Sequence, residues 1–263
     1  MWSARAAMFT GLIVCGLSLP IVLVGCKSTN SPEVGQKTEP PQKLAMPNEA
    51  PATSPVPLSG PINYVALGDS TGAGVGAREG GYVARLFKLI VARRPGSKLT
   101  NLCVSGATTA DVYQGQLKEG LNAHPNLVTL GIGINDIGHG VSLEKFSKNY
   151  EELLSTLKNK TTAQIVVTNI PDISSAPRIP HIVRNEYQQL IGQFNRKLEE
   201  IAARHGVTVF DVYTITHEEL PGHPEFFSSD GFHPSDQGYE LWAEKMWPTV
   251  AGAIGVKVES ESP

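Results

Sequence analysis

Short apolar runs alternate with amphipathic stretches from residue 62 onward. The apolar runs have the length and composition of buried strands, and there are five of them: 62–67, 98–104, 127–131, 164–169 and 207–211. Apolar side chains recur at helical spacing in the stretches between them and in one after the last: 82–93, 109–121, 143–158, 183–205 and 234–253. Strands that alternate with helices are typical of a parallel sheet with helices on both faces. The pattern therefore predicts an α/β domain over residues 62–258, with a short tail at 259–263.

The start of the chain has a different pattern, because Arg5 precedes an almost wholly apolar run that ends near residue 25. This is the outline of a secretory signal peptide. The run ends in Leu-Val-Gly-Cys at residues 23–26, which resembles the processing box of bacterial lipoprotein signals. The resemblance implies cleavage before Cys26 and diacylation of its sulfur, and hence an exported lipoprotein anchored to a membrane of the bacterial cell envelope. An uncleaved N-terminal anchor is the alternative.

A segment poor in large apolar residues separates the leader from the predicted domain. Residues 26–61 are rich in proline, serine, threonine, glutamate and lysine, so they cannot bury enough surface to offset the entropy of ordering. Chains with this much proline are extended and act as semi-rigid spacers. We therefore expect a tether that holds the domain away from the membrane surface.

Charge and cysteine content narrow the possible partners and the means of stabilisation. The formal net charge is −3 and the sequence contains no long basic run, which argues against nucleic acid as a partner. Of the three cysteines, Cys15 lies in the leader and Cys26 is assigned to lipid, so Cys103 has no partner for an internal disulfide. The domain is therefore expected to depend on its hydrophobic core.

Residues with catalytic potential follow the predicted strands. Ser70 comes after the first strand, Gly106 after the second and Asn135 after the third, while Asp230 and His233 precede the last helix. The carboxyl ends of parallel strands meet at one edge of the sheet, where ligands bind in such folds. We therefore expect these five residues to gather at one site.

Their chemistry suits acyl transfer. A serine hydroxyl is a weak nucleophile until a base takes its proton, and His233 is the candidate base for Ser70. Asp230, only three residues earlier, can orient the imidazole and stabilise its charged form. The oxygen that becomes negative in the tetrahedral intermediate needs fixed hydrogen-bond donors. The side-chain amide of Asn135 and the backbone N–H groups of Gly106 and Ser70 are the candidates.

These segments match, in order, the four sequence blocks of the SGNH (GDSL-type) hydrolases: Gly-Asp-Ser at 68–70, Gly106, Gly-Ile-Asn-Asp at 133–136 and Asp-Gly-Phe-His-Pro at 230–234. The resemblance implies a flavodoxin-like three-layer α/β/α sandwich with a five-stranded parallel sheet. It further implies a catalytic triad, an oxyanion hole, and no metal or organic cofactor. The triad would be Ser70, Asp230 and His233, and the oxyanion donors Ser70, Gly106 and Asn135. Thr71 stands where many members carry leucine, and its side chain takes no part in proton transfer.

Four other interpretations fit parts of the sequence. Residues 68–72 also satisfy Gly-x-Ser-x-Gly, the nucleophile elbow of α/β-hydrolases, although that serine follows several strands rather than the first. Residues 72–77 fit a dinucleotide-binding fingerprint but lack the acidic residue expected about twenty positions later. A zinc site is conceivable at His217, His223 and His233, whose spacing is irregular. A catalytically silent lipoprotein that only binds an acyl or glycan ligand is the non-enzymatic alternative.

The resemblance leaves the ester open, since the family includes esterases, arylesterases, lysophospholipases, thioesterases and carbohydrate O-acetyl esterases. We expect the substrate walls to come from the loops 72–80, 137–141, 170–181 and 214–229. Their apolar residues favour an acyl chain, in a small-molecule or lipid ester, over a sugar: Ile137, Ile173, Ile179, Phe226 and Phe227.

Overall fold

The computed structural model describes residues 58–258, so Cys26, the predicted leader, nearly all of the predicted tether and the tail lie outside the described residues. Five parallel strands form one sheet in the order β2-β1-β3-β4-β5. Their bounds are β1 (Asn63–Gly68), β2 (Lys98–Asn101), β3 (Leu127–Gly131), β4 (Gln164–Thr168) and β5 (Thr208–Phe210). The five predicted strands and their parallel arrangement are thereby confirmed.

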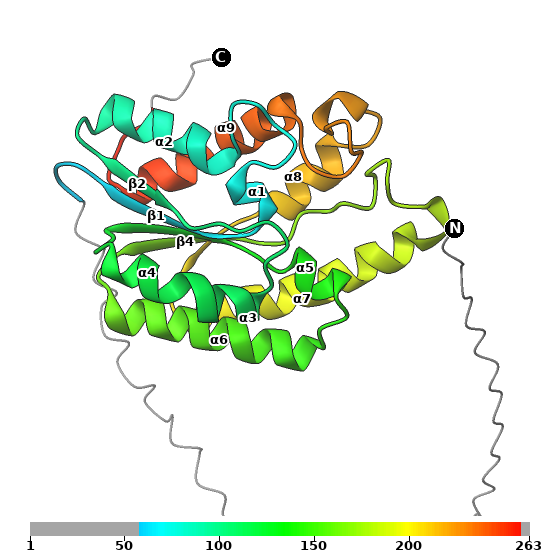
Figure 1. Cartoon of the computed structure of the whole chain (residues 1–263), viewed down its shortest axis with the longest axis horizontal. Helices are drawn as coiled ribbons and strands as arrows, with labels where there is room; N and C mark the ends of the chain where they lie inside the picture. The colour runs from blue at the N-terminus through cyan, green and yellow to red at the C-terminus, as the bar shows by residue number, and fades with distance from the viewer. Residues whose placement is uncertain (1–57, 259–263) are drawn as a thin grey trace, which may run out of the picture. The chain divides into compact units, whose positions relative to one another are not determined.

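Helices cover both faces of the sheet, which completes the predicted three-layer sandwich (Figure 1). On one face lie α2 (Tyr82–Arg93) and α9 (Asp236–Ala253); on the other lie α4 (Leu117–Asn122), α6 (Leu143–Lys160) and α7 (Arg184–Arg204). Between residues 58 and 258, no helix has both the length and the apolar character needed to cross a membrane.

The alternation of side chains along each strand builds two hydrophobic cores. In β1, Tyr64 and Ala66 point to the core shared with α2 and α9, whereas Val65 and Leu67 point to the core shared with α6 and α7. All four side chains are at most 1% exposed. A strand buried on both faces reads as a continuous apolar run, which is why the pattern predicts these strands so well.

The edge strand β2 ends earlier than the predicted 98–104 segment. The backbone of Leu102 and Val104 still donates to β1, but the N–H of Cys103 donates to the side chain of Asn101 instead. The amide of Asn101 also donates to the carbonyl of Gly72 at 2.9 Å. Alternate N–H groups of an edge strand point away from its neighbour, so Asn101 satisfies an outward N–H group. The hydrogen bonds to β1 continue to residue 104, although the regular strand ends at Asn101.

The predicted helix 109–121 is divided into three parts. A short helix α3 (Thr109–Asp111) leads into a π-helical turn (Val112–Gln116) and then into α4. The apolar spacing does not reveal this wide turn, which inserts Gln116 into the protein at 4% exposure. π-Turns within α-helices are frequent at functional sites.

Several short elements are not predicted by the apolar pattern. They are α1 (Ser70–Ala73), α5 (Ile134–Gly138), α8 (Val212–Glu219) and two 3₁₀ turns, His181–Val183 and Pro224–Phe226. Such lengths are too short to establish a helical period. In addition, α9 begins at Asp236 rather than at residue 234, because Ser235 is its N-cap and accepts from the N–H of Gly238.

Candidate active site

The site lies where the direction of the strand order changes. The chain passes from β1 to β2 on one side and then returns to β3 on the other side of β1. The connections that leave β1 and β3 therefore diverge and open a crevice at their carboxyl ends. Ser70 is the first residue of α1, directly after β1, and Asn135 is in α5, directly after β3.

A continuous chain of hydrogen bonds joins three of the predicted residues. The Oγ of Ser70 lies 3.0 Å from Nε2 of His233, and Nδ1 of His233 lies 2.6 Å from Oδ2 of Asp230. These separations suit proton transfer from the hydroxyl to the ring and stabilisation of the ring by the carboxylate. The structure thus brings the three residues together, while their catalytic roles stay a prediction.

Asp230 is held as an ionised acceptor. Its Oδ1 accepts from the Oγ of Ser228 and from the backbone N–H groups of Phe232 and His233, at 2.8, 2.8 and 2.9 Å. Burial acts to raise the pKa of Asp230, but the hydrogen bonds from His233, Phe232 and Ser228 together hold the pKa well below its ordinary value. An ionised Oδ2 keeps the proton on Nδ1 of His233, so Nε2 is left to accept the proton of Ser70.

Ser70 lies in a turn that is fixed by the residue before it. Oδ1 of Asp69 accepts from the backbone N–H of Thr71 at 2.9 Å and from the hydroxyl of Thr71 at 2.8 Å, and so caps α1. Asp69 thus has a structural role in a tight turn. Because Asp69 is only 2% exposed, burial outweighs these hydrogen bonds and raises its pKa to about 6.

Ser70 follows the end of β1, whose position is set by Gly68 and Gln116. Gly68 has a φ of +153°, and a Cβ at this position would lie 2.3 Å from the carbonyl oxygen of Gly131, so only glycine fits. The amide of Gln116 accepts from the N–H of Gly68 and donates to its carbonyl, both at 2.8 Å. The sequence does not predict this supporting role of Gln116. Its one available sign is a long polar residue within the predicted amphipathic segment 109–121.

Asn135 and Gly106 belong to neighbouring segments. Nδ2 of Asn135 donates to the carbonyl of Ala107, the residue after Gly106, at 2.9 Å. An amide nitrogen carries two hydrogens, so one is left for a substrate oxygen. Gly106 has a φ of +81°, and a Cβ there would meet no atom within 4 Å. Ile134, the neighbour of Asn135, lines the same pocket as Ser70, which places this segment beside the nucleophile.

Asp136 joins this segment to a distant part of the chain. Its carboxylate accepts from the N–H of Thr109 at 2.9 Å and from the Thr109 hydroxyl at 2.6 Å, so it joins α5 to α3 rather than closing a local turn. Asp136 is fully buried, and burial raises its pKa despite these two hydrogen bonds. These two hydrogen bonds fix the loop after β3 to the loop after β2. They therefore also fix Asn135 relative to the segment that carries Gly106.

An apolar pocket with a volume of about 50 Å³ opens beside Ser70 and His233. A single water molecule needs roughly 10 to 15 Å³ of such volume, so the pocket has room for only a few atoms. Its apolar walls come mainly from the segments after β4 and β5 and from α9: Pro171, Ile173, Val212, Ile215, Leu220, Phe226, Phe227, Leu241 and Trp242.

The residues that line the pocket differ in part from the substrate walls predicted from the sequence. The loops 170–181 and 214–229 contribute, and so do the predicted residues Ile173, Phe226 and Phe227. The loops 72–80 and 137–141 do not line it, and neither do Ile137 and Ile179, which are buried in the core on the other face of the sheet. The reason is that α5 and the 170–181 segment turn these side chains inward, at 7% and 8% exposure.

A second, wider groove of about 700 Å³ lies between the loop after β2 and the π-turn. Gly106 is part of its lining, together with polar residues that include Asn101, Gln114 and Glu119. The predicted oxyanion segment is therefore next to a space that differs from the apolar pocket in both size and polarity.

The glycine segment 72–77 is not arranged as a dinucleotide site. Gly72 lies within α1, and the backbone N–H groups of Arg78 and Glu79, just past the glycines, donate to the carboxylate of Asp236. A phosphate would need such N–H groups to be free. Within the fingerprint itself, the N–H groups of Gly74, Val75 and Ala77 already donate to backbone carbonyls of the same turn, so they are not free either.

The three histidines considered for zinc each have a separate carboxylate partner. His217 pairs with Asp172 at 2.8 Å and His223 with Glu225 at 2.9 Å, while His233 pairs with Asp230. Over the described range 58–258, no group of three or more histidine, cysteine, aspartate or glutamate residues is arranged to hold a metal ion.

Comparison with known proteins identifies the family. A profile described as GDSL-like lipase/acylhydrolase matches residues 66–241. The chain is 28% identical to Lipase 1 of Streptomyces coelicolor, over 66% of this chain and 81% of that protein. It is 26% identical to the lipase/acylhydrolase from Enterococcus faecalis, with a TM-score of 0.59, over 73% of this chain and 96% of that one.

A variant of an acetyl xylan esterase from Geobacillus stearothermophilus has the same fold, with 22% identity and a TM-score of 0.62 over 77% of this chain and 99% of that one. The candidate nucleophile directly follows β1, the first strand of the domain, which argues against the nucleophile-elbow alternative. Since the family profile matches more than half of the sequence, this chain belongs to the GDSL-like lipase/acylhydrolase family and is an ester-hydrolysing enzyme.

Proposed function

We propose that the protein hydrolyses carboxylic esters through an acyl-serine intermediate on Ser70. The observation that carries the proposal is the hydrogen-bonded chain from Asp230 through His233 to Ser70. As Oγ attacks the ester carbonyl carbon, Nε2 of His233 takes the hydroxyl proton, and it gives this proton to the departing alcohol when the C–O bond breaks. Water then attacks the acyl-serine with His233 again as the base, and releases the acid and free Ser70.

The negative oxygen of each tetrahedral intermediate is assigned to three donors: the backbone N–H groups of Ser70 and Gly106 and the side-chain amide of Asn135. The bond from Asn135 to Ala107 supports this assignment, because it fixes the amide beside Gly106 before substrate arrives. Donors that are already oriented need no reorganisation during the reaction, and each is worth roughly 100- to 1000-fold in rate.

The acyl group is proposed to be short. The apolar pocket beside Ser70 and His233 has a volume of about 50 Å³, which suits an acyl chain of a few carbon atoms. Phe226 and Phe227 in its wall present apolar surface to such a chain. Esters of a short acyl group are therefore the first candidate substrates.

A carbohydrate O-acetyl ester is the second candidate. The observation that favours it is the groove of about 700 Å³ beside Gly106, whose side chains include the amides of Asn101 and Gln114 and the carboxylate of Glu119. These groups can donate to or accept from hydroxyls. An acetyl group in the apolar pocket and a sugar in the groove would use both spaces.

The location of the enzyme is also a proposal. The apolar run after Arg5 and the Leu-Val-Gly-Cys box at 23–26 support export and lipidation of Cys26, with residues 26–61 as the tether. Two or more acyl chains hold a protein firmly at a membrane, whereas a single chain does not. Replacing Cys26 with serine should therefore release the protein from membranes while ester hydrolysis continues.

A fluorophosphonate probe, which reacts with activated serines, tests the nucleophile. Wild-type protein and Ser105→Ala should be labelled, whereas Ser70→Ala should not, and Ser105 serves as the control because it also follows a strand and lies on the exposed loop after β2. A folded wild-type protein that stays unlabelled would support the catalytically silent alternative and reject the proposal.

A substrate series tests the two candidate esters. p-Nitrophenyl esters from acetate to decanoate should show kcat/KM highest at the shortest chains and falling steeply beyond about four carbons. Acetylated xylo-oligosaccharides and lysophospholipids complete the series. A preference for the acetylated sugar would establish the second candidate, and a preference for long acyl chains would reject both.

A further inference from the structure

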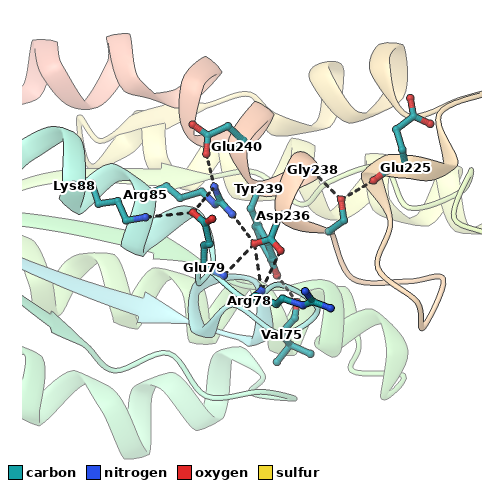
Figure 2. A network of polar contacts seen from close by, with 11 residues as sticks. Val75, Arg78, Glu79, Arg85, Lys88, Glu225, Asp236, Gly238, Tyr239 and Glu240 are labelled. Atoms are coloured by element: carbon teal, nitrogen blue, oxygen red, sulfur yellow. Dashed lines mark hydrogen bonds and ion pairs between the residues drawn. The ribbon is translucent and has the colours of Figure 1, made fainter.

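The loop after the nucleophile is fastened to the helix after the base. This loop, residues 74–80, connects α1 to α2, and α9 begins three residues after His233. Figure 2 shows the polar contacts between them, with Asp236 at the centre, reached from the loop and from α2. The loop follows the helix that carries Ser70, and α9 follows the segment that carries His233, although these two residues lie 163 positions apart in sequence.

Asp236 makes the connection through the loop backbone. Its Oδ1 accepts from the N–H of Glu79 at 3.0 Å, and both of its oxygens lie 3.2 Å from the N–H of Arg78. Asp236 is also the first residue of α9, where a carboxylate is stabilised by the helix dipole. One side chain therefore satisfies two loop donors and the start of the helix at the same time.

Arg85 forms an ion pair with Asp236. Its guanidinium, on α2, is only 7% exposed and donates to Oδ1 of Asp236 at 2.8 Å, and it also pairs with Glu240. A buried charge needs an opposite charge in contact with it. Asp236 is 41% and Glu240 65% exposed, so Asp236 is the better shielded partner of the two.

Two further contacts hold the same segments together. The hydroxyl of Tyr239, one turn into α9, donates to the carbonyl of Val75 at 2.9 Å. At Gly76, a Cβ would lie 2.7 Å from the carbonyl oxygen of Pro234, so the glycine lets the loop approach the residue directly after His233. The glycines of this loop thus have a use in packing against α9.

We propose that Asp236 is a positioning residue for the reaction: by fastening the 74–80 loop to the first turn of α9, it sets the distance between Ser70 and His233. The inference rests on the proposed function of that pair. The Oγ to Nε2 separation is 3.0 Å, and a displacement of about 1 Å in such a site costs roughly 100-fold in rate. Asp236 touches neither substrate nor the reacting atoms, so its effect is on kcat rather than on binding.

The test compares Asp236→Ala with Glu240→Ala. Both variants remove a carboxylate partner of Arg85, but only the first also removes the acceptor of the loop N–H groups. We expect kcat on the best p-nitrophenyl ester to fall about 10- to 100-fold in Asp236→Ala with KM within twofold, and to stay within twofold in Glu240→Ala. Equal losses in the two variants, or a kcat within twofold in both, would overturn the inference.

Two further measurements keep the result decisive. Tyr239→Phe removes only the hydroxyl that donates to Val75, and it should lower kcat about threefold or more with KM unchanged even if Asp236→Ala does not fold. Crystal structures should show the Ser70 to His233 separation beyond 3.5 Å in Asp236→Ala but not in Glu240→Ala, and unchanged distances would reject the inference. Wild-type protein inactive on every ester would reject the proposed function instead, and the structures would still decide the role of Asp236.

Discussion

Replacing Asp230 with asparagine tests how the proposed triad works, because the change is almost isosteric. Three donors converge on Oδ1, and the carbonyl oxygen of asparagine can accept from all of them: Ser228, Phe232 and His233. Only the second oxygen changes, where an NH₂ group would face Nδ1 of His233 in place of a carboxylate 2.6 Å away.

The consequence is a change of tautomer rather than a loss of structure. An NH₂ group donates, so Nδ1 of His233 would have to accept, and its proton would move to Nε2, which faces Ser70. A protonated Nε2 cannot take the hydroxyl proton. Triads with this change lose about 10,000-fold in kcat, equivalent to about 5.5 kcal/mol of transition-state stabilisation. Since three of the four hydrogen bonds to Asp230 remain, we expect the free energy of unfolding to fall by only about 1 kcal/mol.

Steady-state hydrolysis of p-nitrophenyl acetate, together with thermal unfolding, measures both effects. Ser228→Ala is the control, because it removes one donor to Oδ1 and leaves the oxygen that faces His233 unchanged. It should retain kcat within about threefold. If Asp230→Asn kept more than a tenth of the wild-type kcat while folded, Asp230 would not be the orienting carboxylate, and the tautomer argument would be refuted.

Three other predictions follow from the same site. Asn135→Ala should lower kcat about 100- to 1000-fold with little change in KM, and an effect below tenfold would remove Asn135 from the oxyanion hole. Gln116→Leu leaves the buried N–H of Gly68 without an acceptor. The free energy of unfolding, measured by urea titration, should therefore fall by about 1 to 3 kcal/mol. Folding raises the pKa of Asp69 from 3.8 to about 6, so the free energy of unfolding of the wild type falls as the pH rises from about 4 to 6. Asp69→Asn lacks this titration and should gain about 2 kcal/mol of stability relative to the wild type between pH 4 and pH 7, and parallel stability curves would contradict this.

The sequence predicts the sheet and the proximity of Ser70, Asp230 and His233 well because both depend on short-range patterns. Buried parallel strands are continuous apolar runs, and the carboxyl ends of such strands share one edge, so Ser70, Asn135 and His233 could be placed before any coordinates. Asp230 and His233 are three residues apart, and their contact needs only a local turn.

The supporting residues could not be predicted, since they act across long separations. Gln116 reaches Gly68 from a π-turn that has no signature in the apolar spacing, and Asp236 reaches Glu79 from the far end of the chain. Asp136 illustrates the same limit: its position suggests a local turn, but its partner is Thr109, 27 residues away. A side chain's nearest neighbours in sequence are a poor guide to its partner when the fold brings two loops together.

The apolar pocket, lined in part by Ser70 and His233, and the polar groove, lined in part by Gly106, share no lining residue. The pocket is built after β4 and β5 and from α9, whereas the groove is built after β2. If, as proposed, the acyl group occupies the pocket and the alcohol occupies the groove, substitutions in one can alter the preferred acid of the ester without altering the preferred alcohol. An enzyme arranged in this way can acquire new substrates one half at a time, with the reacting atoms left in place.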